Sequence, residues 1–301
     1  MLSRFFSSSQ PFHYLVGILL LGPTSILLLW LLNGDWQWSY AIIGLILPFA
    51  LLLVQFIILK NELTGQNSYG LFAYTMLTLS VIVGIVEWKL AVCLLLFLLA
   101  LRRLMSLKTG TSTIRKIFDG TFWISIATLL EPYMAIYFLA VFTAIFLFDR
   151  TKWRHWAIPI IAVVCVIVIS FTLEIFLEQP ILTRIFYRSE YGFNGLLKEW
   201  NPSDLLAWFL CATAVIGFVI YIIKLVDIQQ RVRPRFSVLV IAGVCSLILA
   251  LVGDAHFVLL LIPVISIFQV RALEHIYHRG FREFIFLLPA LLIVLALLTQ
   301  G

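Results

Sequence analysis

Long apolar runs separated by short polar gaps dominate the chain. The clear runs cover residues 14–32, 40–59, 69–86, 157–177, 204–226 and 284–300, and a further run at 89–107 ends on Arg102-Arg103. A helix needs about 20 apolar residues to cross the hydrocarbon core of a bilayer. The pattern therefore predicts an all-α membrane protein that crosses the bilayer several times.

Two further runs are too long for one crossing. Run 117–148 is interrupted by Glu131-Pro132, and run 236–270 is interrupted at 253–256. Proline cannot continue the backbone ladder of a helix, and a Gly-Asp pair favours a turn. Each run is therefore predicted to form two short helices, 117–130 with 132–148 in the first case. This gives about 11 transmembrane segments, and whether the two hairpins span the bilayer or re-enter it is left open.

Basic residues fall almost entirely in every second gap. One set of gaps holds 17 of the 21 Lys and Arg residues and the other holds four, provided that both broken runs count as two crossings. Gaps rich in Lys and Arg stay in the cytoplasm. We therefore expect a cytoplasmic amino terminus and a carboxyl terminus on the outside.

Composition agrees with this assignment. The chain of 301 residues is 62% hydrophobic and 12% charged, whereas a soluble domain has about 25% charged residues. The net charge of +6 fits the bias toward basic cytoplasmic gaps and contact with anionic lipids, so we expect no nucleic-acid partner. We expect one integral membrane domain over 1–301, no soluble domain, and the longest outer loop at 178–203.

That outer loop contains a candidate phosphate-binding or lipid-binding group. Arg184 and Arg188 are four residues apart, with Tyr187 beside them, so the two arginines share one face if the segment is helical. Guanidinium groups bind phosphate by paired hydrogen bonds. Ion pairs with nearby acidic residues of the same loop are the alternative.

Four residues of the outer gaps are candidates for acid–base chemistry. They are Asp35, Glu131, Asp254 and His256. Asp254 and His256 are two residues apart at a hairpin tip, and Glu131 lies at the other tip, where partial burial would make it a functional candidate. Simple turn positions are the alternative for each.

The inner gaps do not indicate a metal or nucleotide site. Glu274-His275 with His278 has a metal-like spacing, but its charged surroundings favour a solvated helix near the membrane. The segment 108–116 lacks the glycine pattern of a nucleotide loop and is expected to contact acidic lipids. We expect no metal and no cofactor.

Several segments resemble an uncharacterised inner-membrane family of Bacteroidota, a domain of unknown function. They are Lys60 to Ser68, Leu99 to Leu104, Lys116 to Asp119 with Trp123, and Arg154 to Trp156 ahead of Pro159. This resemblance implies a Gram-negative inner membrane but no activity.

A second resemblance concerns the layout. Basic gaps on either side of a hairpin centred on Glu131-Pro132-Tyr133, and the stretch from Asp254 to Pro263, look like the core of integral-membrane glycosyltransferases that use polyprenyl-phosphate sugars. The resemblance implies that Asp35 is the base and that Arg184 or Arg188 holds the phosphate of the polyprenyl lipid.

Three functions are therefore compared. The first is a non-enzymatic partner or scaffold for another membrane protein of the cell envelope. The second is a glycosyltransferase-like enzyme working at the outer face. The third, a transporter, ranks last because Gln55 is about the only strongly polar side chain inside a predicted span, and transport needs several.

Overall fold

The chain is described here by a computed structural model, and every regular element within its described residues is a helix. The described residues are 6, 10–82, 87–148, 152–178, 196, 205–223, 233–253, 255–275, 280, 283 and 291. The helices are α2 (Pro11–Asn33), α3 (Trp38–Asn61), α4 (Tyr69–Ile82), α5 (Trp88–Met105), η1 (Ser106–Thr109), α6 (Thr113–Leu130), η2 (Pro132–Tyr137), α7 (Phe138–Phe148), α8 (Trp153–Leu177), α10 (Leu205–Ile223), α11 (Arg233–Ile248), η5 (Leu249–Gly253), η6 (Ala255–Phe257) and α12 (Val258–His275).

Five of these helical stretches are long and apolar enough to cross a membrane. They are Pro11–Asn33, Trp38–Asn61, Trp88–Thr109, Trp153–Leu177 and Arg233–Gly253, and three shorter apolar helices accompany them in the described part of the chain. The prediction of an all-α polytopic membrane protein is thus supported at this coarser level. The predicted span 284–300 and nearly all of the loop 178–203 lie outside the described residues.

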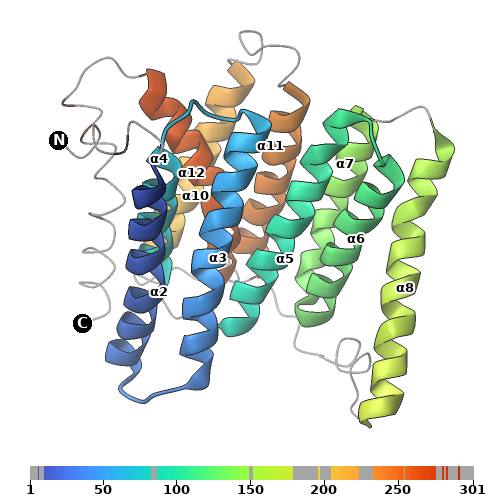
Figure 1. Ribbon diagram of the computed structural model, residues 1–301, viewed down its shortest axis with the longest axis horizontal. Coiled ribbons are helices and arrows are strands. Elements are labelled where there is room, and N and C mark those ends of the chain that lie inside the picture. Colours follow the sequence, from blue (N-terminus) through green and yellow to red (C-terminus); the bar gives the residue numbers. More distant parts are fainter. Residues whose placement is uncertain are drawn as a thin grey trace.

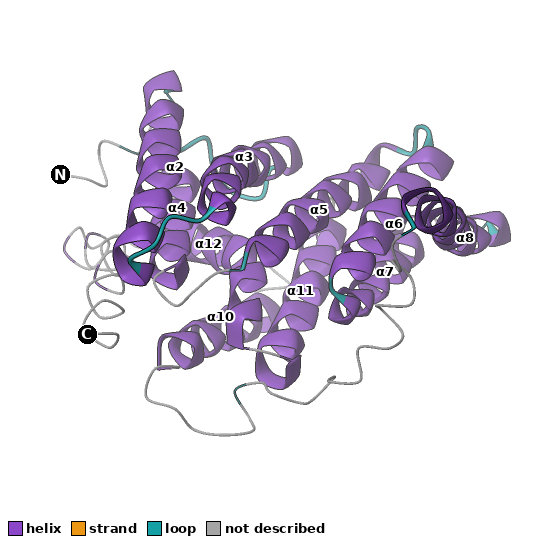
Figure 2. Ribbon diagram, turned by 90° about the horizontal axis from the view of Figure 1, so that it is seen from below, coloured by secondary structure: helices purple, strands orange, loops and turns teal. Residues whose placement is uncertain are grey.

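The helices form two layers (Figures 1 and 2). The first layer is the row α2, α3, α5, α6 and α8, in which each helix packs against the next. The second contains α4, α12, α11 and α7, with α10 packed against α12. Helix α5 is central, because it contacts α3 and α6 on its two sides and α7, α11 and α12 behind it.

Burial follows from these positions. Helix α5 is buried over most of its length, with Leu94, Leu98 and Ala100 fully inaccessible. At the end of the row, α8 packs mainly on α6 and buries only 17% of its most apolar 18-residue stretch. In a bilayer such an exposed apolar surface faces lipid or another membrane protein.

Both predicted breaks are present. Helix α6 ends at Leu130, Glu131 has an extended backbone, and Pro132 begins η2. The second run passes from α11 through the π turn η5 and the short η6 into α12. The predicted helix 132–148 is present as one apolar helical stretch, Pro132–Phe148, whose residues 132–137 are a 3-10 helix before α7. Tighter turns of this kind are common at the ends of α-helices.

Proximity of helix ends shows that the helices alternate in direction. Lys108 after α5 reaches the end of α3, Arg235 at the start of α11 reaches the same point, and Glu274 at the end of α12 reaches the start of α4. We call this side, with Lys60, Lys108 and Arg235, the basic end. At the opposite end the two hairpin tips meet, with the rings of Tyr133 and Phe257 5.6 Å apart.

Candidate functional site

The described acidic and imidazole side chains predicted at the outer face lie in the connections at the end of the bundle opposite the basic end. Asp35 is exposed in the turn between α2 and α3, Glu131 is half-buried between α6 and η2, and His256 is exposed in η6. Asp254, Arg184, Tyr187 and Arg188 lie outside the described residues.

Helix α5 separates Asp35 from Glu131. It packs between α3 and α6, as Figure 2 shows from below. Packed helices have axes about 8–10 Å apart, so the axes of α3 and α6 are roughly 16–20 Å apart across α5. Asp35 and Glu131 therefore extend from helices that are not neighbours.

Glu131 and His256, in contrast, belong to adjacent hairpin tips. Tyr133, two residues after Glu131, packs against Phe257, the residue after His256, with the two rings at 72°. A Cβ atom on Gly253 would also lie 3.8 Å from the Tyr133 ring. The structure thus brings the two broken runs together at their tips, as a shared site would require, although it leaves Asp35 apart from them.

The most connected polar group of the described residues lies at the basic end, in the segment between α3 and α4, residues 62–68, which we call the α3–α4 connector. Helix α3 ends at Asn61, and Glu62 has a left-handed backbone with a φ of 55°. This conformation lets the backbone N–H of Leu63 donate to the carbonyl of Ile58 (3.1 Å), which closes the helix.

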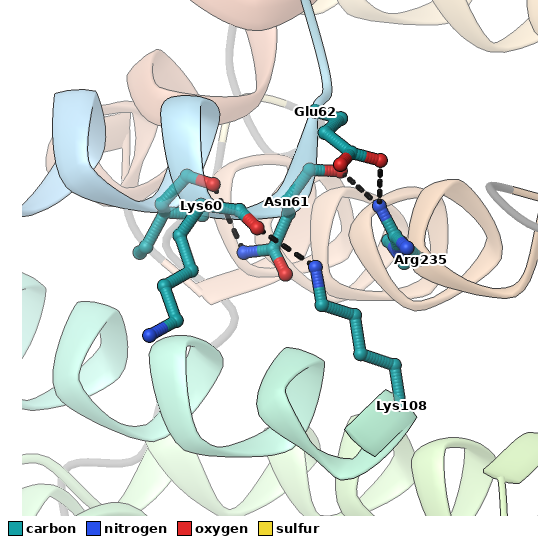
Figure 3. Close-up of polar contacts among 6 residues, drawn as sticks. Lys60, Asn61, Glu62, Lys108 and Arg235 are labelled. Atoms are coloured by element: carbon teal, nitrogen blue, oxygen red, sulfur yellow. Dashed lines mark hydrogen bonds and ion pairs between the residues drawn. The ribbon is translucent and has the colours of Figure 1, made fainter.

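Arg235 joins α11 to this helix end (Figure 3). Its Nη1 atom donates to the backbone carbonyl of Asn61 (2.5 Å) and to Oε2 of Glu62 (3.1 Å). Its side chain is only 3% exposed, whereas that of Glu62 is 61% exposed. A buried cation needs such partners because burial removes its hydration.

Lys108 ties the segment after α5 to the end of α3, and Glu274 ties α12 to the connector. Lys108 Nζ donates to the carbonyl of Lys60 (2.7 Å), where the carboxyl end of α3 favours positive charge (Figure 3). Oε1 of Glu274 on α12 accepts from the backbone N–H of Gly65 and from Nδ2 of Asn67, both at 2.6 Å.

Glycine at position 65 permits this approach. A Cβ atom there would lie 3.1 Å from the Glu274 carboxylate, which is closer than ordinary contact distance. Asn67 also accepts from the N–H of Tyr69 (3.2 Å) at the start of α4. Glu274, considered in the sequence as part of a metal-like spacing, is therefore used in the structure to hold the connector.

The amino-terminal side of the protein contributes to the same group. Nδ1 of His13 on α2 lies 3.1 Å from Oγ of Ser68, and Ser68 N–H donates to the carbonyl of Phe6 (2.9 Å). Gln55, the one polar side chain noted within a predicted span, donates weakly to the carbonyl of Asn67 (3.4 Å). The connector and the end of α3 before it thus contact α2, α11, α12 and the segment after α5.

Sequence reasoning missed this role for Arg235, Asn61 and His13. From the sequence, Arg235 was used only as one of the 17 basic residues that predict which gaps face the cytoplasm. A possible signal was its position directly before an apolar run, since a cation there must either extend to water or find a buried partner.

A second polar feature at the basic end is an open cavity of about 550 Å³ between α6 and α8. Its lining residues are Ser112, Thr113, Ile114, Arg115, Lys152 and His155. Lys116 follows Arg115 but is engaged elsewhere, since its Nζ donates to the carbonyl of Ser106 (2.9 Å) and to Oγ1 of Thr109 (2.6 Å). Desolvation and then the nearby cations Arg103 and Lys60 lower the pKa of Lys116.

Comparison with known proteins identified no match among family models, curated proteins or solved structures.

Proposed function

We propose that this protein is a non-enzymatic scaffold of the cell envelope, a multi-span protein of the bacterial inner membrane that holds another membrane protein. The observation that carries the proposal is that polar side chains at the basic end bond to the protein's own backbone. Arg235, Lys108 and Glu274 bond to the backbone of the α3–α4 connector or of the helix end before it. They join helices to one another, which favours a rigid body.

The arrangement of the outer candidates supports the same proposal. An enzyme needs its reacting groups at one centre, within about hydrogen-bond reach of the substrate atoms. Asp35 and Glu131 extend from helices separated by α5, so these two carboxylates do not share such a centre.

Helix α8 offers the surface on which a partner could bind. Ile161, Val168 and Phe171 on its outward side are each more than half exposed, and α6 is its main neighbour among the described helices. Lipid and a partner helix can both cover bulky apolar side chains of this kind. Fluid lipid also tolerates added side-chain volume, whereas a docked helix does not, so adding volume distinguishes lipid from a partner.

The experiment is complementation of a strain that lacks the gene, scored as survival under osmotic and detergent stress. Ile161→Trp with Val168→Trp adds volume to the outward side of α8, which lipid tolerates and a docked helix does not. We expect this variant to fail and the triple variant Asp35→Asn, Glu131→Gln, His256→Gln to complement. Leu19→Trp, on the 56% exposed outer side of α2, is the matched control and should complement.

Equal membrane levels of all variants, measured by immunoblot, make the comparison interpretable. Failure of the triple variant at a normal level would overturn the scaffold in favour of an enzyme. Full complementation by the α8 variant would exclude α8 as the partner surface and remove the proposal in this form.

The glycosyltransferase-like enzyme is the second candidate, and one observation favours it. The contact of Tyr133 with Phe257 places the tip that carries Glu131 beside the tip that carries His256. In this alternative Glu131→Gln alone abolishes complementation, and a polyprenyl-phosphate sugar is the donor.

A further inference from the structure

The cavity between α6 and α8 combines positive charge with a concave shape. Arg115 and Lys152 line it from two different helix starts, together with the hydroxyl-bearing Ser112 and Thr113. Its volume of about 550 Å³ lies within the range of about 300–1,000 Å³ that is usual for small-molecule sites. The lining contains no acidic side chain among the described residues, so its character is cationic.

The lining is also partly built into the fold. His155 is only 4% exposed and Thr113 only 9%, so the floor of the cavity belongs to the packed part of the protein. Arg115 and Lys152 are exposed at its rim. A cavity with a buried polar floor and a cationic rim differs from a set of unrelated surface lysines.

The backbone at the cavity also favours binding of an anion. Helices α6 and α8 both begin there, and the first N–H groups of a helix have no partner within it. In both first turns, which lie within the described residues, no acidic residue is present and neither Ser112 nor Lys152 supplies a side-chain cap. An anion in the cavity would meet two positive helix ends as well as two cations.

The position of the cavity indicates how an anion could reach it. Trp153, the first residue of α8, is 76% exposed, and Trp156 stacks on Phe142 at 6.2 Å. Tryptophan collects at the level of lipid headgroups. The rim of the cavity therefore lies where a headgroup phosphate and an aqueous phosphate can both enter.

We propose that the cavity between the first turns of α6 and α8 binds a phosphate group, carried by an anionic lipid or free in solution. Arg115 and Lys152 supply the charge, and Ser112 supplies a hydroxyl donor, while the Thr113 hydroxyl donates to the carbonyl of Gly110. This site is independent of the scaffold function, because it lies on a different part of α8 from the outward side tested above.

The test uses the full-length protein purified in a neutral maltoside detergent, with thermal unfolding followed as each probe is added. One arm adds phosphatidylglycerol in mixed micelles and the other adds inorganic phosphate, while oleate controls for anionic lipid without phosphate. We expect a saturable rise in melting temperature with one or both phosphate probes and none with oleate. Saturation by phosphatidylglycerol alone identifies a headgroup site, and saturation by inorganic phosphate identifies a free-phosphate site.

The variants decide whether the cavity is responsible. Arg115→Gln with Lys152→Gln should weaken binding of the effective probe at least about tenfold, since it removes two charge-assisted hydrogen bonds. Lys116→Gln with Arg154→Gln removes the same charge from the same helix ends without touching the lining and should change affinity less than about twofold. Equal affinities of the two double variants, or no saturable binding of either probe, would overturn the proposal.

A single exposed substitution guards against a folding artefact. Lys152→Glu reverses the charge at the rim without altering a packed residue and should abolish the effect of the phosphate probe, while the melting temperature without probe stays unchanged. Retained binding by this variant would also overturn the proposal.

Discussion

At the scale of single residues, Arg235 shows how a membrane protein uses a buried charge. The sequence places it at the boundary of an apolar run, where a long cation could extend to water. The structure instead buries it against the carbonyl of Asn61 and the carboxylate of Glu62. Since only Glu62 remains largely exposed, most of the benefit comes from pairing the cation with the buried end of α3.

Replacing Arg235 should therefore cost more than replacing its acidic partner. Arg235→Met removes a donor from the buried Asn61 carbonyl and should lower the free energy of unfolding by about 1–3 kcal/mol. Glu62→Gln should cost less than about 1 kcal/mol, because an exposed ion pair contributes little. Unfolding by denaturant in mixed micelles measures both variants, and an equal or greater cost for Glu62→Gln would contradict the assignment.

At the scale of elements, close backbone approach joins α2 to α3. A Cβ atom on Gly22 would lie 3.1 Å from the carbonyl oxygen of Gly44, and one on Gly44 would collide with the side chain of Ile26. Small residues allow such approach between helices in lipid, where no hydrophobic drive brings helices together. Packing of α2 on α3 thus depends on two glycines opposite each other.

The prediction at this scale is a coupling between Gly44 and Ile26. Gly44→Ala should destabilise the protein by about 1–3 kcal/mol through overpacking. In the double variant with Ile26→Ala the loss should be smaller than the sum of the two single losses, because the colliding atoms are gone. A double-mutant cycle on the free energy of unfolding measures this, and strict additivity would show that Ile26 is not the obstacle.

The sequence pattern predicted where the two long runs break but not the conformation of the backbone at the breaks. Breaks at Glu131-Pro132 and near residue 254 followed from local chemistry, since proline and a Gly-Asp pair act on their own backbone. The 3-10 form of η2 and the π turn η5 did not follow. In the structure the end of η2 packs on α11, with the Tyr137 hydroxyl 2.6 Å from Oγ of Ser246, a contact between residues far apart in the chain.

At the scale of the whole molecule, the two-layered bundle has chemically different ends. Connections tied together by Lys108, Arg235 and Glu274 lie at one end, and the hairpin tips with Tyr133 and Phe257 lie at the other. The basic end corresponds to the gaps predicted to face the cytoplasm. The architecture is compatible with this orientation, and labelling can test it.

Cysteine labelling from either side of the membrane measures the orientation. In a Cys165→Ser background, which leaves the buried Cys93, Cys211 and Cys245, we expect Asp35→Cys to react with an impermeant maleimide in intact spheroplasts. Ser112→Cys should react only after permeabilisation. Both positions are exposed, so access to the reagent depends on the side of the membrane alone, and the reverse pattern would invert the predicted topology.

The sequence by itself determined the class of the protein, the positions of most helices and the two breaks, because hydropathy and proline chemistry act locally. It also predicted which gaps share a side of the membrane, since the cost of moving charge across a bilayer depends on composition. Only the tertiary structure decided which helices are neighbours. The arrangement of neighbouring helices separates Asp35 from Glu131 and lets Glu274 and Arg235 bond to the α3–α4 connector. It also forms the cationic cavity from two helix starts about 40 residues apart in the chain. Contacts between distant segments depend on side-chain packing, which the local sequence pattern does not encode.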